Sequence, residues 1–325
     1  MEGRRDDVTR RTVLAAGLGA AAVALGAVGT AQAAQNGNGW RVVDAATGKD
    51  LRWQDLPGRL APSNAIFVGE FHDDPQTHRV ERALLEEVHK WAGDRLTLAM
   101  EMFERDNQGA LDDYLAGRTD EAAFGKAARL WPNYATDYKP LIEYAKAKKV
   151  PVLASNAPQA IVRRVGREGL DAVYPRLSEA ERATVADYVL TPEDDYYRRF
   201  AKVMGGGSGG GDGQSAAHGR MDPAMLRRMY EAQCLRDATM AQTIAGALAA
   251  GRTVLHINGS FHSDAGLGTA ARVLWRRPLD TRLSVVKVVP VKDDVKKADP
   301  TADRTEADYL IYVPDERPAP KPKEA

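Results

Sequence analysis

The sequence has a single cysteine and no excess of charge of either sign. Cys234 alone cannot form an internal disulfide or a cluster of thiolate metal ligands, so we interpret it as a small core residue. The chain carries 45 basic and 45 acidic residues, which leaves no net positive charge to attract a phosphate backbone. We therefore expect no nucleic-acid partner.

The first 33 residues have the pattern of an export signal. Arg10 and Arg11 stand in a twin-arginine pattern at residues 9–14, a run rich in Ala and Gly follows, and small residues at 31–33 suit a cleavage site. The run is only modestly hydrophobic, so an uncleaved anchor is the weaker alternative. We expect residues 1–33 to be a cleaved twin-arginine signal peptide, with a periplasmic or secreted product and no stable membrane span after cleavage.

The rest of the chain is long enough for one large domain with a well-buried core. Apolar, strand-like segments alternate with segments of helical periodicity, which is typical of parallel βαβ units. The sequence predicts an α/β fold: an open, mostly parallel central sheet with helices on both faces, helical insertions and an antiparallel edge strand. The strands that matter for function are predicted at 65–69, 96–100, 152–155 and 254–257.

Two further strands and a loop complete the expected organisation. Residues 34–290 are expected to form the domain, with an edge strand at 283–289 and a flexible glycine-rich loop at 205–213. The loop lacks the GK[ST] ending of a phosphate-binding loop. Residues 291–325 are predicted to hold one more edge strand, at 308–313 and of uncertain direction, and a disordered tail rich in Pro, Lys and Glu.

Each of the four predicted strands ends in a polar residue of a reactive type. In an open α/β sheet, ligands bind outside the carboxyl ends of the strands, so residues far apart in sequence meet in one crevice. We take that crevice as the candidate functional site. Its predicted residues are Glu70, His72, Glu101 and His262, with Arg105, Asn156, Asn258 and Gly259 in support.

Glu70 and His72 stand two positions apart at a strand end. A carboxylate and an imidazole so placed can share a divalent metal ion or act as a hydrogen-bonded acid–base pair. The structural alternative is that Glu70 caps a neighbouring helix while His72 bonds to Asp73 or Asp74.

Glu101 ends an apolar strand, so its carboxylate needs a partner if it is buried. Arg105, one turn further on, is a candidate partner that would make Glu101 structural. If Glu101 faces Glu70 instead, the two like charges raise one pKa or recruit a cation. The sequence leaves both alternatives open.

We expect the other histidines to have minor roles or none in the candidate site. His256 lies inside a predicted strand, and we expect it to be a packed core residue. His78 falls in the first turn of a helix that begins with an Asp cap and with Pro75 at the first helical position, and it can line the crevice from above. His89 and His218, on an exposed helical face and beside the glycine-rich loop, receive no role.

Five separated motifs stand out along the chain: GEFHDD at 69–74, AMEMFERDNQ at 99–108, NAP at 156–158, EAQ and DATMA within 231–241, and NGSFH at 258–262. They resemble, in the same order, those of the ChaN-like haem-binding uptake family, which belongs to the wider Tiki and erythromycin-esterase-like superfamily. The resemblance covers roughly residues 60–290. The chain departs from some relatives because it has no lipid-attachment cysteine and carries the glycine-rich insertion.

The resemblance implies an α/β fold, export across the inner membrane and haem handling in iron acquisition. It also implies haem bound between two subunits with tyrosine as the iron ligand, and hence a homodimer on haem binding. Phenolate ligation leaves no spacing signature, and the candidate tyrosines are Tyr138, Tyr196 and Tyr197. The superfamily's polar site falls here on Glu70, His72, Glu101 and His262.

Two functions from different classes are therefore predicted. The first is an exported haem-binding protein for haem or iron uptake, and the resemblance favours this binding role over an enzymatic one. The second is a metal-dependent hydrolase of peptidase or esterase type, in which a divalent ion lowers the pKa of bound water. Its metal ligands would be Glu70, His72, Glu101 and His262, a set that does not select one metal. A metal-free version would use His72 or His262 as the general base.

Overall fold

The computed structural model describes residues 39–204 and 221–318, all of which belong to one compact unit, Ala33–Ala325. The expected signal peptide at 1–33, the glycine-rich loop at 205–213 and His218 lie outside the described residues. Within the described ranges, no helix is both long and apolar enough to cross a membrane.

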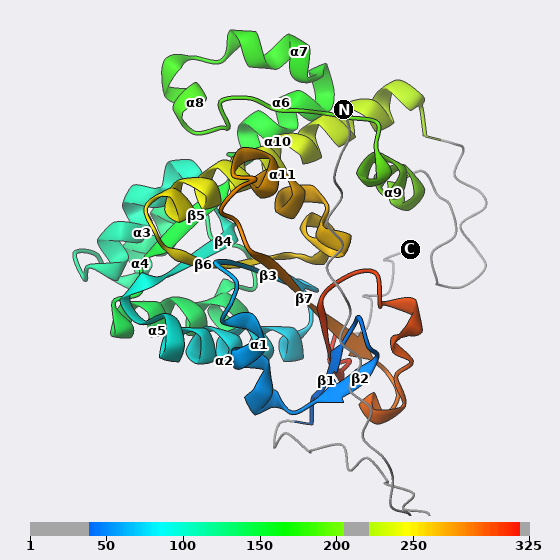
Figure 1. Ribbon diagram of the computed structural model, residues 1–325. Helices are drawn as coiled ribbons and strands as arrows, with labels where there is room; N and C mark the ends of the chain where they lie inside the picture. Colours follow the sequence, from blue (N-terminus) through cyan, green and yellow to red (C-terminus); the bar gives the residue numbers. More distant parts are fainter. Residues whose placement is uncertain (1–38, 205–220, 319–325) are drawn as a thin grey trace, which may run out of the picture. The chain divides into compact units, whose positions relative to one another are not determined.

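A single mixed sheet of eight strands forms the centre of this unit (Figure 1). The strands are β1 (Arg41–Asp44), β2 (Lys49–Leu51), β3 (Ala65–Glu70), β4 (Leu96–Glu104), β5 (Val152–Asn156), β6 (Thr253–Gly259), β7 (Leu283–Val291) and β8 (Tyr309–Pro314). Their order is β2-β1-β8-β7-β3-β6-β4-β5, and every neighbouring pair from β8 to β5 is parallel. β1 runs antiparallel to β2 and β8. The predicted mostly parallel sheet with an antiparallel edge is therefore confirmed.

Two strands that the sequence analysis places at edges lie inside the sheet. β7 stands between β3 and β8, and β8 stands between β7 and β1. The edge assignment of 283–289 and 308–313 is wrong because the β1–β2 hairpin covers β8 and forms that edge itself. This hairpin was not predicted, since its second strand carries the polar pair Lys49 and Asp50 and has no apolar periodicity. Burial on both faces explains why Leu310–Val313 are almost fully enclosed.

Helices cover both faces of the sheet, as predicted (Figure 1). One face packs against α2 (Pro75–Ala92), α3 (Gln108–Leu115), α4 (Glu121–Ala128) and α5 (Lys139–Lys148). The other packs against α10 (Pro223–Ala249) and α11 (Gly268–Arg276). A separate apolar cluster joins α10 to α6 (Gln159–Glu168) and α7 (Leu170–Val173). The remaining helices are α1 (Leu56–Leu60), α8 (Glu179–Ala183) and α9 (Asp195–Met204).

Strand β3 shows how the core positions the site. Ile66 and Val68 belong to the core beneath α2, whereas Ala65 and Phe67 belong to the core beneath α10. A strand buried on both faces is apolar throughout, as central parallel strands are. Its first polar side chain, Glu70, therefore comes where the strand reaches the rim of the sheet.

The connection from β3 to α2 is short and tightly capped. The Asp74 carboxylate accepts a hydrogen bond from the backbone N–H of Thr77, and Pro75 occupies the first turn of the helix. The predicted Asp cap and Pro start are confirmed. Because the chain turns into the helix at once, the first turn of α2 lies directly above the end of β3.

Candidate functional site

Three neighbouring strands bring the predicted polar residues to one rim of the sheet. β3, β6 and β4 are adjacent and parallel, so their carboxyl ends lie on the same side. Glu70 is in register with Gly259 on β6. Glu101 follows Met100, the last residue of β4 that is in register with β6. The strand order therefore brings together residues that are far apart in the sequence.

Glu70 is the centre of the first group of polar contacts. One of its oxygens, Oε1, accepts a hydrogen bond from the Tyr138 hydroxyl at 2.9 Å and is paired with Nδ1 of His72. Its other oxygen, Oε2, lies 3.3 Å from Nδ1 of His78. Burial favours the neutral acid, but the interactions with Glu81, His72 and His78 outweigh it and hold the pKa of Glu70 well below its ordinary value.

His262 is the centre of the second group. Its Nε2 lies 3.2 Å from Oε1 of Glu101, and its Nδ1 lies 2.7 Å from Oδ1 of Asp237. Burial opposes the charged imidazolium, but the two carboxylates raise the pKa of His262 to about 10. Burial likewise opposes the Glu101 carboxylate, yet the charge of His262 lowers the pKa of Glu101 to about 2. This group is a buried ion pair at neutral pH.

Gly259 is where the two groups meet. Its backbone N–H donates to Oε2 of Glu101 at 2.7 Å. A Cβ atom placed on Gly259 would lie only 2.7 Å from Nε2 of His72 and 3.5 Å from Oε2 of Glu101. The structure therefore brings Glu70, His72, Glu101 and His262 together around one glycine. Of these four, His72 alone has a substantially exposed side chain, at 42%.

The predicted supporting residues differ in what they do. Asn156 donates from its side chain to the backbone carbonyl of Glu101, and Asn258 donates to the carbonyl of Gly259 and to the Ser263 hydroxyl. Both therefore fix the backbone of strand ends. The Arg105 guanidinium donates to atoms of α10 and to the carbonyl of Val185. The partners of Glu101 are thus His262 and the Gly259 amide, and the alternative in which Arg105 neutralises it is wrong.

The three candidate haem-ligating tyrosines lie in different places. The Tyr138 hydroxyl donates to Glu70, and the Tyr196 hydroxyl donates to Asp237 at 2.8 Å. Burial raises the pKa of both hydroxyls well above the ordinary range, which disfavours their phenolates. Tyr197 is half-buried and packs edge-on against Tyr230, with ring centroids 4.9 Å apart.

Sequence reasoning missed Asp237 on α10 and Glu81 on α2, although it expected His78 to line the crevice. Asp237 on α10 orients His262 and also accepts a hydrogen bond from the Thr269 hydroxyl at 2.8 Å. His78 and Glu81 stand one turn apart on α2, with His78 Nδ1 3.0 Å from Oε2 of Glu81. The available signal was a polar side chain on the apolar face of each helix, which must find a partner when buried.

Glu70, His78 and Glu81 have the spacing of metal ligands. One donor atom from each lies within 4.8 Å of the others. The group shares only Glu70 with the metal-ligand set predicted from the sequence. His256, in contrast, is a packed core histidine as expected, with Nδ1 3.2 Å from the carbonyl oxygen of Ala99.

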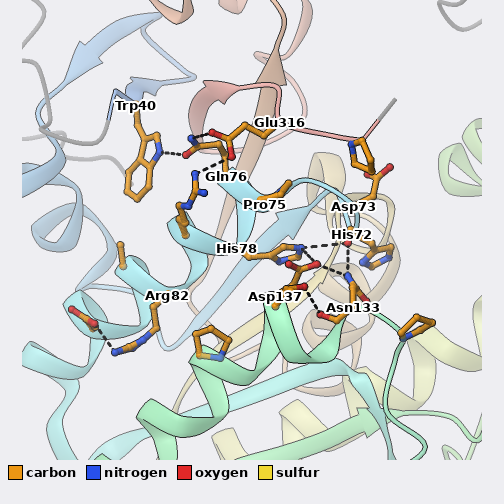
Figure 2. Close-up of a pocket in the computed structure, with 17 residues that line it drawn as sticks. Trp40, His72, Asp73, Pro75, Gln76, His78, Arg82, Asn133, Asp137 and Glu316 are labelled. Carbon is orange, nitrogen blue, oxygen red and sulfur yellow. Dashed lines mark hydrogen bonds and ion pairs between the residues drawn. The ribbon is translucent and has the colours of Figure 1, made fainter. Parts of the chain in front are cut away.

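His72 stands between two cavities. The smaller, of about 530 Å³, is lined by polar and apolar side chains. The polar lining includes Glu70, His72, Gln233 and His262, and the apolar lining, called the apolar wall below, includes Phe200, Val203, Met204 and Phe261. The larger, of about 1130 Å³, lies over the first turns of α2 (Figure 2). Its lining includes Trp40, His78, Arg79, Arg82, Asn133, Asp137 and Glu316.

Comparisons with known proteins find one matching family and several similar structures. The family model described as "Haem-binding uptake, Tiki superfamily, ChaN" matches residues 56–273. The structure is similar to that of ChaN of Campylobacter jejuni, described as showing cofacial haem binding. The TM-score is 0.60 at 15% identity, and the match covers 84% of this chain and 96% of that one. The erythromycin esterase EreC in its open conformation gives a TM-score of 0.43 at 10% identity over 77% of this chain and 76% of that one.

A curated plant protein is similar in sequence. Protein RETICULATA-RELATED 5, chloroplastic, of Arabidopsis thaliana is 25% identical over 291 residues, which cover 82% of this chain. The chain spans only 36% of that relative's length.

Proposed function

This chain belongs to the ChaN family of haem-binding uptake proteins in the Tiki superfamily, and we propose that it is an exported protein that binds haem for haem or iron uptake. The observation that carries the proposal beyond family membership is the smaller cavity beside His72, where an apolar wall meets an accessible imidazole.

The residues around this cavity suit a porphyrin. Val203 is 65% exposed and Met204 is 36% exposed, so the wall offers apolar surface that the described part of the chain leaves uncovered. A cavity of about 530 Å³ is within the range of sites that enclose small organic ligands. Haem supplies an iron that takes nitrogen, sulfur or phenolate ligands from the protein.

His72 is the ligand that we propose for the iron. Its Nδ1 is held by the Glu70 carboxylate, an arrangement that fixes the ring and leaves Nε2 as the atom available to a metal. Tyr138 and Tyr196 are buried and already donate to carboxylates. Of the three predicted tyrosines, Tyr197 therefore remains as the alternative iron ligand to His72.

A hemin titration of the purified protein tests the proposal. The parent is expected to give a saturable shift of the Soret band, and His72→Ala is expected to alter the position of that band, whereas Tyr197→Phe leaves it unchanged. Val203→Asp places a charge on the apolar wall and is expected to weaken hemin binding at least about 10-fold, equivalent to about 1.4 kcal/mol. The matched control is Leu279→Asp, at a side chain that is 99% exposed and does not line the cavity. Absence of any Soret shift in the parent would overturn the function.

Export and dimer formation are parts of the same proposal. The twin-arginine pattern at Arg10 and Arg11 supports delivery to the periplasm or the medium. Replacing both with lysine should retain the protein in the cytoplasm, as cell fractionation and N-terminal sequencing would reveal. Sedimentation with and without hemin tests the dimer, since a mass that does not change on loading contradicts it.

A second candidate function, hydrolysis, is favoured by the alignment of Asp237, His262 and Glu101. The Asp237 carboxylate on Nδ1 orients the imidazole, as in acid–base catalysis, and Nε2 faces the Glu101 carboxylate. His262 itself lines the smaller cavity. We propose ester or amide substrates. Turnover of simple esters and peptides by the parent, lost in His262→Gln, would support this function. Equal rates for parent and variant would exclude it.

A further inference from the structure

We propose that Glu70, His78 and Glu81 form a binding site for a divalent first-row transition-metal ion. All three residues are buried, with at most 4% of their surface exposed. Glu70 comes from the end of β3, whereas His78 and Glu81 come from adjacent turns of α2. The site goes beyond haem binding and shares a single residue with the polar group around Gly259.

The spacing of the donor atoms fits such an ion. Nδ1 of His78 lies 3.3 Å from Oε2 of Glu70 and 3.0 Å from Oε2 of Glu81. Ligand bonds of about 2.0–2.2 Å in a tetrahedral arrangement separate donor atoms by about 3.3 Å. A cation could therefore enter between the three side chains with small side-chain movements.

Two carboxylate oxygens of the group lack hydrogen-bond partners. Among the described residues, neither Oε2 of Glu70 nor Oε1 of Glu81 has one, although both atoms are buried. Oε1 of Glu70, in contrast, is occupied by Tyr138 and His72. Buried polar atoms nearly always have a partner, because leaving them without one costs the full desolvation of the group. Oε2 of Glu70 is also the oxygen that lies 3.3 Å from Nδ1 of His78, and Oε1 of Glu81 belongs to the carboxylate whose Oε2 lies 3.0 Å from the same nitrogen. A cation held among the three side chains would supply a partner for both oxygens.

The contacts of the His78 ring orient it for metal binding. Its Nε2 lies 3.3 Å from the carbonyl oxygen of His72 and 3.6 Å from Oδ2 of Asp137, two acceptors that call for an N–H at this position. Figure 2 shows His78 reaching from α2 towards Asp137 and Asn133. A histidine that donates from one ring nitrogen to a carbonyl or carboxylate presents the lone pair of the other to a metal ion. Here that lone pair faces two carboxylates.

The charges and the ligand types define the class of ion. The charges of two carboxylates and one divalent cation sum to zero, so the ion would neutralise the buried group without an additional proton. One imidazole with two carboxylates suits Mn²⁺, Fe²⁺, Co²⁺ or Zn²⁺ and does not suit soft ions such as Cu⁺. His78 lines the larger cavity and Glu70 lines the smaller, so an ion has a short path to the site from either side.

Calorimetric titration of the full, chelator-treated protein with Zn²⁺ and separately with Mn²⁺ tests the site. The parent is expected to bind one equivalent, and Glu81→Gln to bind at least about 100-fold more weakly. The matched control is Glu87→Gln, on the same helix, whose carboxylate pairs with Lys90 at the surface. A second control, His262→Gln, should bind the ion as the parent does.

Three results would overturn the site: no binding of either ion by the parent, equal binding by the parent and Glu81→Gln, or binding lost in His262→Gln alone. If Glu81→Gln fails to fold, a crystal of the parent soaked in Zn²⁺ decides instead. The anomalous peak is expected about 2.0–2.2 Å from Nδ1 of His78, and a peak elsewhere refutes the proposal. Hemin titration of the same chelator-treated parent shows whether haem is bound, whatever the result for the metal site. Failure of the metal site and failure of haem binding can therefore be told apart.

Discussion

His72 and Gly259 are packed so closely that no side chain fits between them. The position of a Cβ atom on Gly259 lies 2.7 Å from Nε2 and 2.9 Å from Cε1 of the imidazole. Gly259 ends β6 and His72 follows β3, so this contact joins two strands that are almost 190 residues apart in the sequence. The contact holds the exposed imidazole in the lining of the smaller cavity.

Gly259→Ala is therefore expected to displace His72. The new methyl group requires the ring to move and to disturb its pairing with Glu70, so we expect a loss of about 1–3 kcal/mol in the free energy of unfolding and a changed hemin spectrum. Urea unfolding and absorption spectroscopy measure the two effects. Gly246→Ala, in α10 with open space at the Cβ position, should be neutral or stabilise by up to about 1 kcal/mol. Equal stability of the two variants would show that the contact is loose.

Asp237→Asn is expected to lower the pKa of His262 from about 10, because one of the two carboxylates that raise it loses its charge. A raised histidine pKa stabilises the fold fully below the ordinary value of about 6.5, and this contribution is lost as the pH rises through the folded value. The stability advantage of the parent over Asp237→Asn should therefore shrink as the pH rises from the lowered His262 pKa of the variant to about 10, on the order of 1–3 kcal/mol.

Titration of the His262 ring by NMR and urea unfolding at several pH values measure these effects. Asp113→Asn, which breaks an exposed pair with Arg118, is the control and should show no such trend. A His262 pKa that is the same in Asp237→Asn as in the parent would contradict the assignment.

His256 is expected to make the fold sensitive to acid. Burial lowers its pKa to about 4, because the interior disfavours the charged ring. The unfolded chain takes up the proton from about pH 6.5 downwards while the native state does not, so stability falls between pH 6.5 and 4. From pH 6.5 to 4.5 the loss attributable to His256 is about 2–3 kcal/mol.

His256→Asn keeps a donor near the Ala99 carbonyl and removes the titrating ring. We expect the stability of this variant to fall less with acid than that of the parent, as urea unfolding at pH 6.5 and 4.5 would measure. The control His89→Asn changes a half-buried histidine that bonds to Tyr144. Parallel acid dependence in the parent and His256→Asn would refute the buried neutral state.

Tyr138 and Tyr134 provide a matched pair within one helical turn. The Tyr138 hydroxyl donates to the buried Glu70 carboxylate, whereas the Tyr134 hydroxyl is buried with no hydrogen-bond partner among the described residues. Tyr138→Phe is expected to cost about 1–3 kcal/mol of unfolding free energy, and Tyr134→Phe to be neutral or stabilising. Thermal and urea unfolding compare them, and the reverse order of stabilities would show that Glu70 does not depend on this hydroxyl.

The sequence by itself determined the elements and the chemical character of the rim. Apolar segments with polar ends identified the strands that hold Glu70 and Glu101, and the cap at Asp74 identified the start of α2. These features are local, because burial on both faces and the hydrogen bonds of a helix start each require particular residues at fixed spacing. The five motifs that resemble the ChaN-like family are local in the same sense, because each is a short run of particular residues.

Only the tertiary structure decided which of these residues touch. Strand order is set by crossover connections, so the place of β6 between β3 and β4, and with it the contact of His72 with Gly259, could not be read from spacing. The same holds for the interior positions of β7 and β8. The partners Asp237, His78 and Glu81 also depend on how α10 and α2 pack, because a polar residue on an apolar helix face specifies that it needs a partner but not which one.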